Sequence, residues 1–99
     1  MSDSHDLEIV SRVLGGDIEC FSEIIKKYQN KVFRYAYSRV YNYDEALDIS
    51  QEVFVMTFEA LKSFRKESKF STWLYSIMAN YCKNYRKKND RFFRVSLTR

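Results

Sequence analysis

Hydrophobic residues recur at intervals of three and four along most of the chain, a spacing that places them on one side of an α-helix. The first such pattern runs from Asp6 to Leu14, and the second from Ile18 to Tyr41. A third runs from Asp44 to Ser63 and a fourth from Ser71 to about Lys88. We therefore predict an all-α, compact bundle of about four helices, of which the N-terminal one is short and the other three are longer.

Local signals support these boundaries. Gly15 and Gly16 are expected to end the first helix, because glycine tolerates the left-handed conformation of helix ends. Asp17 follows as a predicted N-cap of the second helix. Asn42 is a predicted N-cap of the third, and Glu45 stands three residues later, as in a capping box.

The hydrophobic pattern also predicts the core. In the first helix we expect Leu7, Val10 and either Val13 or Leu14. In the second we expect Phe21, Ile24, Ile25, Tyr28, Val32, Tyr35, Ala36 and Val40. In the third we expect Ile49, Leu47, Val53, Phe54, Thr57 and Leu61, and in the fourth Leu74, Ile77, Met78, Tyr81 and Tyr85.

Length and composition indicate one helical domain. A chain of 99 residues is long enough for a single modest core. It contains no proline and two glycines, which favours long helices and short connections. We expect a flexible N-terminus over residues 1–5, the helical domain over residues 6–90, and a basic tail or the start of a linker over residues 91–99.

Several kinds of function are disfavoured by the residue types present. No stretch approaches the ~18 apolar residues of a membrane span, and no secretory pattern opens the chain, so we expect a cytoplasmic protein. Cys20 and Cys82 lack partners at ligand spacing, and His5 is the only histidine. We therefore expect free thiols, no metal, no cofactor and no enzymatic activity.

Charge divides the chain into two parts. Residues 1–61 carry six basic and eleven acidic side chains, a net charge of −5. Residues 62–99 carry eleven basic and two acidic side chains, a net charge of +9, and the two parts together give the total of +4. The division predicts two surfaces with different partners, of which the basic one suits phosphate.

The acidic surface is predicted in the third helix. Asp48, Gln51 and Glu52 lie three and four residues apart, next to the apolar side that Ile49 and Val53 occupy. Carboxylates and an amide in one small area suit a protein partner more than an acid–base reaction, because nothing in the sequence indicates an apolar pocket that would shift a pKa.

The basic surface combines cations with aromatic rings, from Lys62 through residues 64–73 to residues 80–86. Cations hold a phosphate backbone, rings accept unstacked bases, and asparagine can read a base edge. The combination favours opened or single-stranded nucleic acid over an intact duplex. The alternative is that Phe64, Phe70 and Trp73 simply close the core.

These motifs, in this order, resemble region 2 of bacterial sigma factors, and most of all the extracytoplasmic-function (ECF) group. The resemblance rests on Asp-Ile-Ser-Gln-Glu-Val-Phe at residues 48–54, Leu-Lys-Ser-Phe-Arg at 61–65, Phe-Ser-Thr-Trp-Leu-Tyr-Ser-Ile at 70–77, and Asn80 with Asn84-Tyr85. Gly16-Asp17, Phe21 and Tyr28 extend it into the opening helices, so that it covers residues 7–88.

The resemblance implies a function in transcription initiation. It implies that Asp48, Gln51 and Glu52 dock on the clamp helices of the largest subunit of the RNA polymerase core. It further implies that the loop and the last helix recognise and melt the promoter −10 element and capture a flipped base of its non-template strand. The DNA-binding residues implied are Phe64, Arg65, Lys66, Ser68, Lys69, Phe70, Trp73, Asn80, Lys83, Asn84, Arg86, Lys87 and Lys88.

The chain departs from this family in one respect. Members normally continue to region 4, which reads the −35 element, whereas this sequence ends at Arg99. We expect a fragment of a longer factor rather than a natural single-domain protein, and the resemblance also implies an anti-sigma factor as a partner. Two alternatives stay open: a helical protein-interaction module that an anti-sigma factor binds, and a basic nucleic-acid binder without sequence preference.

Overall fold

Helices account for nearly all of the backbone in the computed structural model, which describes the backbone of residues 2–97 and the side chains of residues 4–85. The elements are α1 (Ser2–Leu14), η1 (Ile18–Cys20), α2 (Phe21–Val40), α3 (Tyr43–Ala60), η2 (Leu61–Ser63) and α4 (Phe70–Leu97). The two η elements are single turns of 3₁₀ helix. The predicted all-α fold with one short and three longer helices is confirmed.

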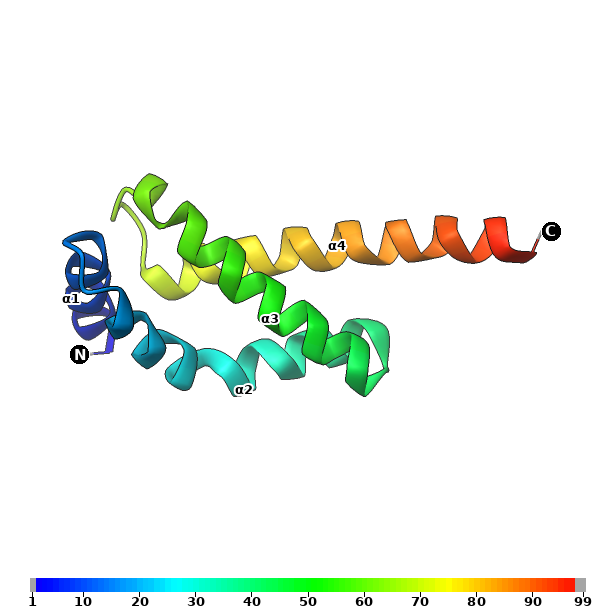
Figure 1. The fold of residues 1–99 in the computed structure, drawn as a ribbon, viewed down its shortest axis with the longest axis horizontal. Helices are drawn as coiled ribbons and strands as arrows, with labels where there is room; N and C mark the ends of the chain where they lie inside the picture. The colour runs from blue at the N-terminus through cyan, green and yellow to red at the C-terminus, as the bar shows by residue number, and fades with distance from the viewer. Residues whose placement is uncertain (1, 98–99) are drawn as a thin grey trace.

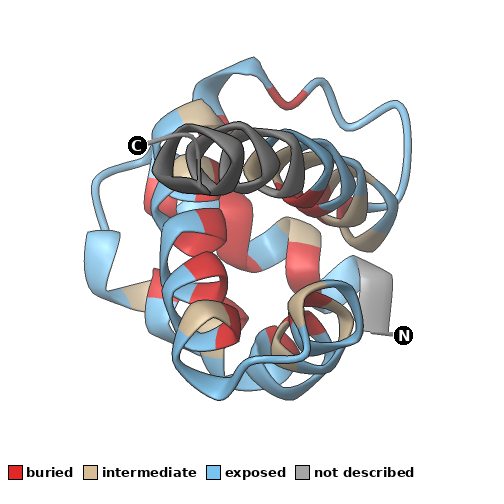
Figure 2. Ribbon diagram, turned by 90° about the vertical axis from the view of Figure 1, so that its right-hand side faces the viewer, coloured by how far each residue is buried: buried red, intermediate tan, exposed pale blue. Residues whose placement is uncertain are grey.

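The helices form a bundle around one core. Figure 1 shows α1 across one end of the bundle, close to the connection that leads from α3 into α4. α2 and α3 pack against each other, and α4 packs on both. Buried residues face inward from all four helices, as the red segments in Figure 2 show.

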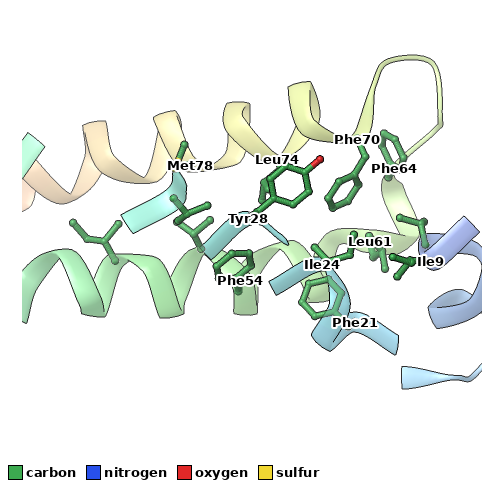
Figure 3. Close-up of a cluster of buried hydrophobic side chains, with 14 of the residues drawn as sticks. Ile9, Phe21, Ile24, Tyr28, Phe54, Leu61, Phe64, Phe70, Leu74 and Met78 are labelled. Atoms are coloured by element: carbon green, nitrogen blue, oxygen red, sulfur yellow. The ribbon is translucent and has the colours of Figure 1, made fainter. Parts of the chain in front are cut away.

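Most of the predicted core residues are confirmed. The side chains of Ile24, Val32, Ile49, Val53 and Leu74 are fully buried. Figure 3 shows how rings from α2, α3, the α3–α4 connection and α4 meet along the core. The alternative at the end of α1 is resolved in favour of Val13, which is buried, whereas Leu14 is exposed.

Leu47 is the one clear error in the predicted core, because its side chain is 40% exposed. The residues that face the core from α3 are Ala46, Ile49, Ser50, Val53, Phe54 and Thr57. At 100° per residue, Leu47 lies about 90° from the centre of that buried face. Ala46, which is fully buried, takes the inward position beside it.

The ends of the helices agree with the predicted signals in part. Gly16 adopts φ +115°, so the predicted glycine stop of α1 is confirmed. Asn42 Oδ1 accepts a hydrogen bond from the Glu45 backbone N–H at 2.9 Å, which confirms the N-cap of α3. Asp17 was expected to cap the second helix but makes no such bond, because the chain first forms the 3₁₀ turn η1 before α2 begins at Phe21.

The first and last helices are longer than predicted. α1 begins at Ser2 rather than Asp6, and α4 continues to Leu97 rather than ending near Lys88. Residues 71–97 contain no glycine or proline, the two residue types that most strongly end a helix. Within the described residues, no helix is both long enough and apolar enough to cross a membrane.

Candidate protein and nucleic-acid interfaces

The predicted acidic site lies on the outer side of α3. Asp48, Gln51 and Glu52 are all exposed, while Ile49 and Val53 between and beside them are buried. The three polar side chains therefore share a surface that the backbone of one helix holds rigidly. Their placement agrees with the predicted surface and leaves the predicted polymerase contact as a hypothesis.

Apolar side chains adjoin this acidic surface, and the sequence interpretation missed them. Leu47, Val55 and Phe58 are exposed large hydrophobic residues of α3. Gln51 lines two neighbouring hollows between α2 and α3, of about 460 Å³ and about 470 Å³. Leu47, Phe54 and Phe58 lie seven and four residues apart, a spacing that could have revealed a second apolar stripe on α3.

Two tyrosines of α4 border the acidic residues of α3. The Tyr85 hydroxyl donates a hydrogen bond to Glu45 Oε1 at 3.2 Å. Burial raises the pKa of Tyr81, and the negative charges of Glu52 and Asp48 raise it further. Tyr81 and Tyr85, which were predicted to be in the core, thus lie half-buried where α4 meets the acidic side of α3.

A small pocket lies at the connection between α3 and α4, where the sequence predicts base capture. Its volume is about 240 Å³, and it is lined by Ser63, Phe64, Arg65, Glu67, Ser68 and Trp73. The residues at 64–69 between η2 and α4 form a loop, which we call the 64–69 loop. Arg65, Lys66, Ser68 and Lys69 of this loop are exposed.

The aromatic rings at the pocket belong partly to the core. Phe64 is 6% exposed and Phe70 is fully buried. For these two rings, the alternative that they close the core therefore agrees with the structure. The Phe64 and Trp73 ring centroids lie 4.9 Å apart, and those of Phe70 and Trp73 lie 5.8 Å apart. Of the three predicted rings, the half-buried Trp73 offers the most surface, while Phe64 forms part of the pocket wall and Phe70 supports both rings from the core.

The predicted contacts on α4 lie further along the helix. Asn80, Lys83 and Asn84 are exposed. Asn80 follows Trp73 by two helical turns, about 10 Å along the axis, and is not among the described side chains that line the pocket. The predicted contacts Arg86, Lys87 and Lys88 lie outside the described side chains.

A buried carboxylate is the main polar feature that the sequence interpretation did not identify. Asp6 of α1 is 1% exposed and forms a salt bridge with Lys27 Nζ at 2.7 Å. It also accepts a hydrogen bond from the Tyr28 hydroxyl. The sequence carries a weak signal for this group, since Asp6 stands three and four residues before the buried Ile9 and Val10.

The remaining candidate groups behave as ordinary side chains. Cys20 and Cys82 are free thiols, as predicted. Burial raises the pKa of the Cys82 thiol, which makes it a poor nucleophile. His5 is exposed and lies 3.8 Å from a Glu23 carboxylate oxygen. Among the described residues, no cluster of histidine, cysteine or carboxylate side chains could hold a metal ion.

Comparison with known proteins decides the family. The model of the family described as Sigma-70 region 2 matches residues 24–92, which include most of the bundle. This chain belongs to the Sigma-70 region 2 family. The resemblance to sigma factors that the sequence motifs indicate is therefore confirmed, and the matched residues include the acidic surface, the 64–69 loop and much of α4.

Individual relatives agree with this family. The chain is 38% identical over 85 residues to the RNA polymerase sigma-H factor of Pseudomonas aeruginosa, covering 86% of this chain and 44% of that protein. It is 41% identical over 80 residues to the ECF RNA polymerase sigma-E factor of Escherichia coli K12, covering 81% and 41%. The chain thus spans less than half the length of these relatives.

A solved structure has the same fold. An engineered region 2 of sigmaE, determined by NMR in complex with GTAAAA, matches with a TM-score of 0.80 and 38% identity. The match covers 87% of this chain and 90% of that one. This chain is therefore a sigma region 2 domain of the ECF type, and its fold is that of a domain solved with a nucleotide sequence bound.

Proposed function

We propose that this domain docks on the core RNA polymerase and recognises and melts the promoter −10 element. The observation that carries the proposal is the pocket of about 240 Å³ between the 64–69 loop and Trp73. It occurs in a fold shared with an engineered region 2 of sigmaE that was solved in complex with GTAAAA. Arg65 and Ser68 line this pocket and could bind a nucleotide's phosphate or base edge.

In this proposal, strand opening is driven by binding energy. Unstacking a base costs a few kcal/mol, so a pocket that accepts only the extruded base stabilises the open promoter selectively. Trp73 would stack on the flipped non-template base, with Phe64 and Phe70 holding the indole from behind. Asn80 and Asn84 would contact neighbouring bases, and Lys69 and Lys83 would hold phosphates. Arg86, Lys87 and Lys88 keep the phosphate role that the family resemblance implies.

The polymerase contact would use the acidic surface of α3. Asp48 and Glu52 offer carboxylates, and Gln51 offers an amide beside the exposed Leu47 and Phe58. Such a surface suits the clamp helices of the largest polymerase subunit through charge-assisted hydrogen bonds around an apolar centre.

An anti-sigma factor is a second candidate partner for the same region. The exposed apolar side chains of α3 and the hollows beside Gln51 provide the contact area that a regulator would need to cover. A regulator bound there would compete with the polymerase. We further propose that the domain acts in the cytoplasm, uses no cofactor and catalyses no reaction itself.

The test is binding to an isolated clamp-helix fragment of the polymerase. We expect the wild-type chain to bind and the Gln51→Ala/Glu52→Ala variant to lose most of its affinity, with unchanged helix content by circular dichroism because both side chains are exposed. A matched control is Glu8→Ala/Glu19→Ala, which removes two exposed polar side chains that line neither of the hollows beside Gln51. Equal binding by both double variants would refute the assignment of this surface.

A further inference from the structure

The 64–69 loop contains a backbone conformation that needs support. Lys66 adopts φ +62°, in the left-handed region that non-glycine residues rarely occupy. Such a conformation persists when surrounding contacts hold it in place. The loop has no regular secondary structure to do this, since it lies between η2 and α4.

The contact that can hold Lys66 comes from α1. Lys66 Nζ donates a hydrogen bond to Ser11 Oγ at 2.9 Å, across 55 positions of sequence. Its neighbours Arg65 and Glu67 both line the pocket, whereas Lys66 is absent from that lining. The left-handed residue therefore directs its own side chain to α1 while the residues on either side form the pocket wall.

The position of Ser11 is set by the seating of α1 on the bundle. Ile9 and Val10 are buried in the core, and Figure 3 shows Ile9 at the end of the core where Phe64 lies. α1 also contacts η2, the turn that leads into the loop. A helix packed in this way can hold a surface hydroxyl at a defined place.

A second connection runs from α1 to the pocket through the interior. Buried Asp6 accepts a hydrogen bond from Tyr28, whose ring centroid lies 6.1 Å from that of Phe70. Phe70 in turn packs on Phe64 and Trp73, with centroid distances of 5.7 and 5.8 Å. α1 is therefore joined to both the loop and the rings of the pocket.

We propose that α1 positions the 64–69 loop, and that Ser11 is the positioning residue that holds Lys66 in its left-handed conformation. Ser11 lies before residue 24, where the match to the family model begins. The consequence for DNA rests on the proposed function, because a loop released from Ser11 would leave the pocket less well formed for an extruded base. The effect of Ser11 on the shape of the 64–69 loop and the pocket does not depend on that function.

Trp73 reports on the pocket directly, because it is the only tryptophan in the chain and lines the pocket. We expect Ser11→Ala to shift Trp73 fluorescence to longer wavelength and to increase its quenching by acrylamide. Ser11→Thr, which keeps the hydroxyl, should behave like the wild type. The matched control is Ser38→Ala: Ser38 is another exposed helical serine, and its hydroxyl bonds the Tyr35 carbonyl of its own helix.

A double-mutant cycle tests whether Ser11 acts through Lys66. Lys66→Ala should change Trp73 quenching in the same direction as Ser11→Ala, and the double variant should change it no further. Additive changes would overturn the proposal, as would wild-type quenching in Ser11→Ala or an equal change in Ser38→Ala. Urea unfolding of each variant excludes a general loss of the fold. If Ser11→Ala proves unstable, the quenching of Trp73 in Lys66→Ala alone tests the contact, and wild-type quenching in that variant would overturn the proposal.

Binding to a fluorescently labelled −10 oligonucleotide separates this proposal from the proposed function. Ser11→Ala should weaken binding by about two- to tenfold, the ratio that one hydrogen bond supplies, while binding to the clamp-helix fragment stays unchanged. If the wild-type chain binds no oligonucleotide but the quenching cycle gives the expected result, the proposed function fails and the positioning role stands. Oligonucleotide affinity unchanged in Ser11→Ala, with wild-type binding present, would overturn the link to DNA.

Discussion

At the scale of single residues, burial decides which polar groups matter for the fold. Asp6 reads as an ordinary helix-start residue in the sequence, yet its carboxylate is buried between Lys27 and Tyr28. Burial raises the pKa of Tyr28, and the hydrogen bond and negative charge of Asp6 raise it further. This cluster joins α1 to α2, so removing one member should cost more than removing a polar group from the surface.

Tyr28→Phe removes the hydroxyl that donates to Asp6 and keeps the ring that packs on Phe70 and Tyr75. We expect a loss of about 1–3 kcal/mol in the free energy of unfolding, because a buried carboxylate loses a hydrogen bond. Urea denaturation measures this. Tyr41→Phe, at an exposed tyrosine, should change the free energy by less than about 0.5 kcal/mol, and equal losses would contradict the role of Asp6.

Lys83 is an exposed cation on α4 that we assign to a phosphate contact. Lys83→Ala should lower the slope of log affinity against log salt concentration by about 0.7, if the contact is to single-stranded DNA. The measurement is oligonucleotide binding over a series of salt concentrations. An unchanged slope would remove Lys83 from the set of phosphate contacts, even if the affinity itself fell.

At the scale of elements, α3 presents different chemistry on its two sides. Its buried side holds Ile49 and Val53, and its outer side holds Asp48, Gln51 and Glu52 beside exposed apolar residues. The two sides keep a fixed relation to each other, because every residue of a helix is rotated by a constant angle from the one before it. The N-cap at Asn42 stabilises the first turn of the helix that carries the acidic surface.

Asn42→Ala removes the side-chain oxygen that accepts from the Glu45 N–H at 2.9 Å. We expect a loss of about 1 kcal/mol in the free energy of unfolding, the usual value for an N-cap. Thermal or urea unfolding measures it, and Asn42→Asp or Asn42→Ser should restore most of the stability because both side chains can cap. Failure of both substitutions to restore stability would show that the cap contributes little.

At the scale of the whole molecule, several buried or half-buried tyrosines contribute to the packing between helices. The pKa values of Tyr28, Tyr75 and Tyr81 are all raised, first by burial and then by nearby carboxylates. A phenol that is held neutral in the folded state contributes its full stability below its pKa in the unfolded chain. That contribution is lost as the pH rises toward the folded-state pKa.

Stability should accordingly fall above the pH of about 10 at which tyrosine ionises in an unfolded chain. Urea midpoints measured from about pH 8 to about pH 11 would show this decline. Tyr28→Phe should make the decline shallower, since it removes one of the groups with a raised pKa. A midpoint that stays constant over this range would contradict the contribution of the buried phenols.

Much of the fold and part of the candidate site were predictable from the sequence. The apolar periodicity predicted the helices, and most residues assigned to the core, such as Ile24, Val53 and Leu74, are buried. Leu47 was wrongly assigned to the core because periodicity predicts an apolar side of a helix without fixing its edges. A residue at such an edge is buried only if a neighbouring helix covers it. The sequence predicted which segments form the α3–α4 pocket, namely the 64–69 loop and the start of the last helix. It left open whether Phe64 and Phe70 are buried.

The sequence by itself determined the helical fold, the division of charge and the family, because periodicity, composition and ordered motifs are local properties of the chain. The tertiary structure decided which side chains meet across long separations. Asp6 with Tyr28, and Ser11 with Lys66, lie 22 and 55 positions apart, and no local spacing predicts either contact. Their partners are selected by how the amphipathic helices pack, since packing brings together residues that the chain itself keeps apart.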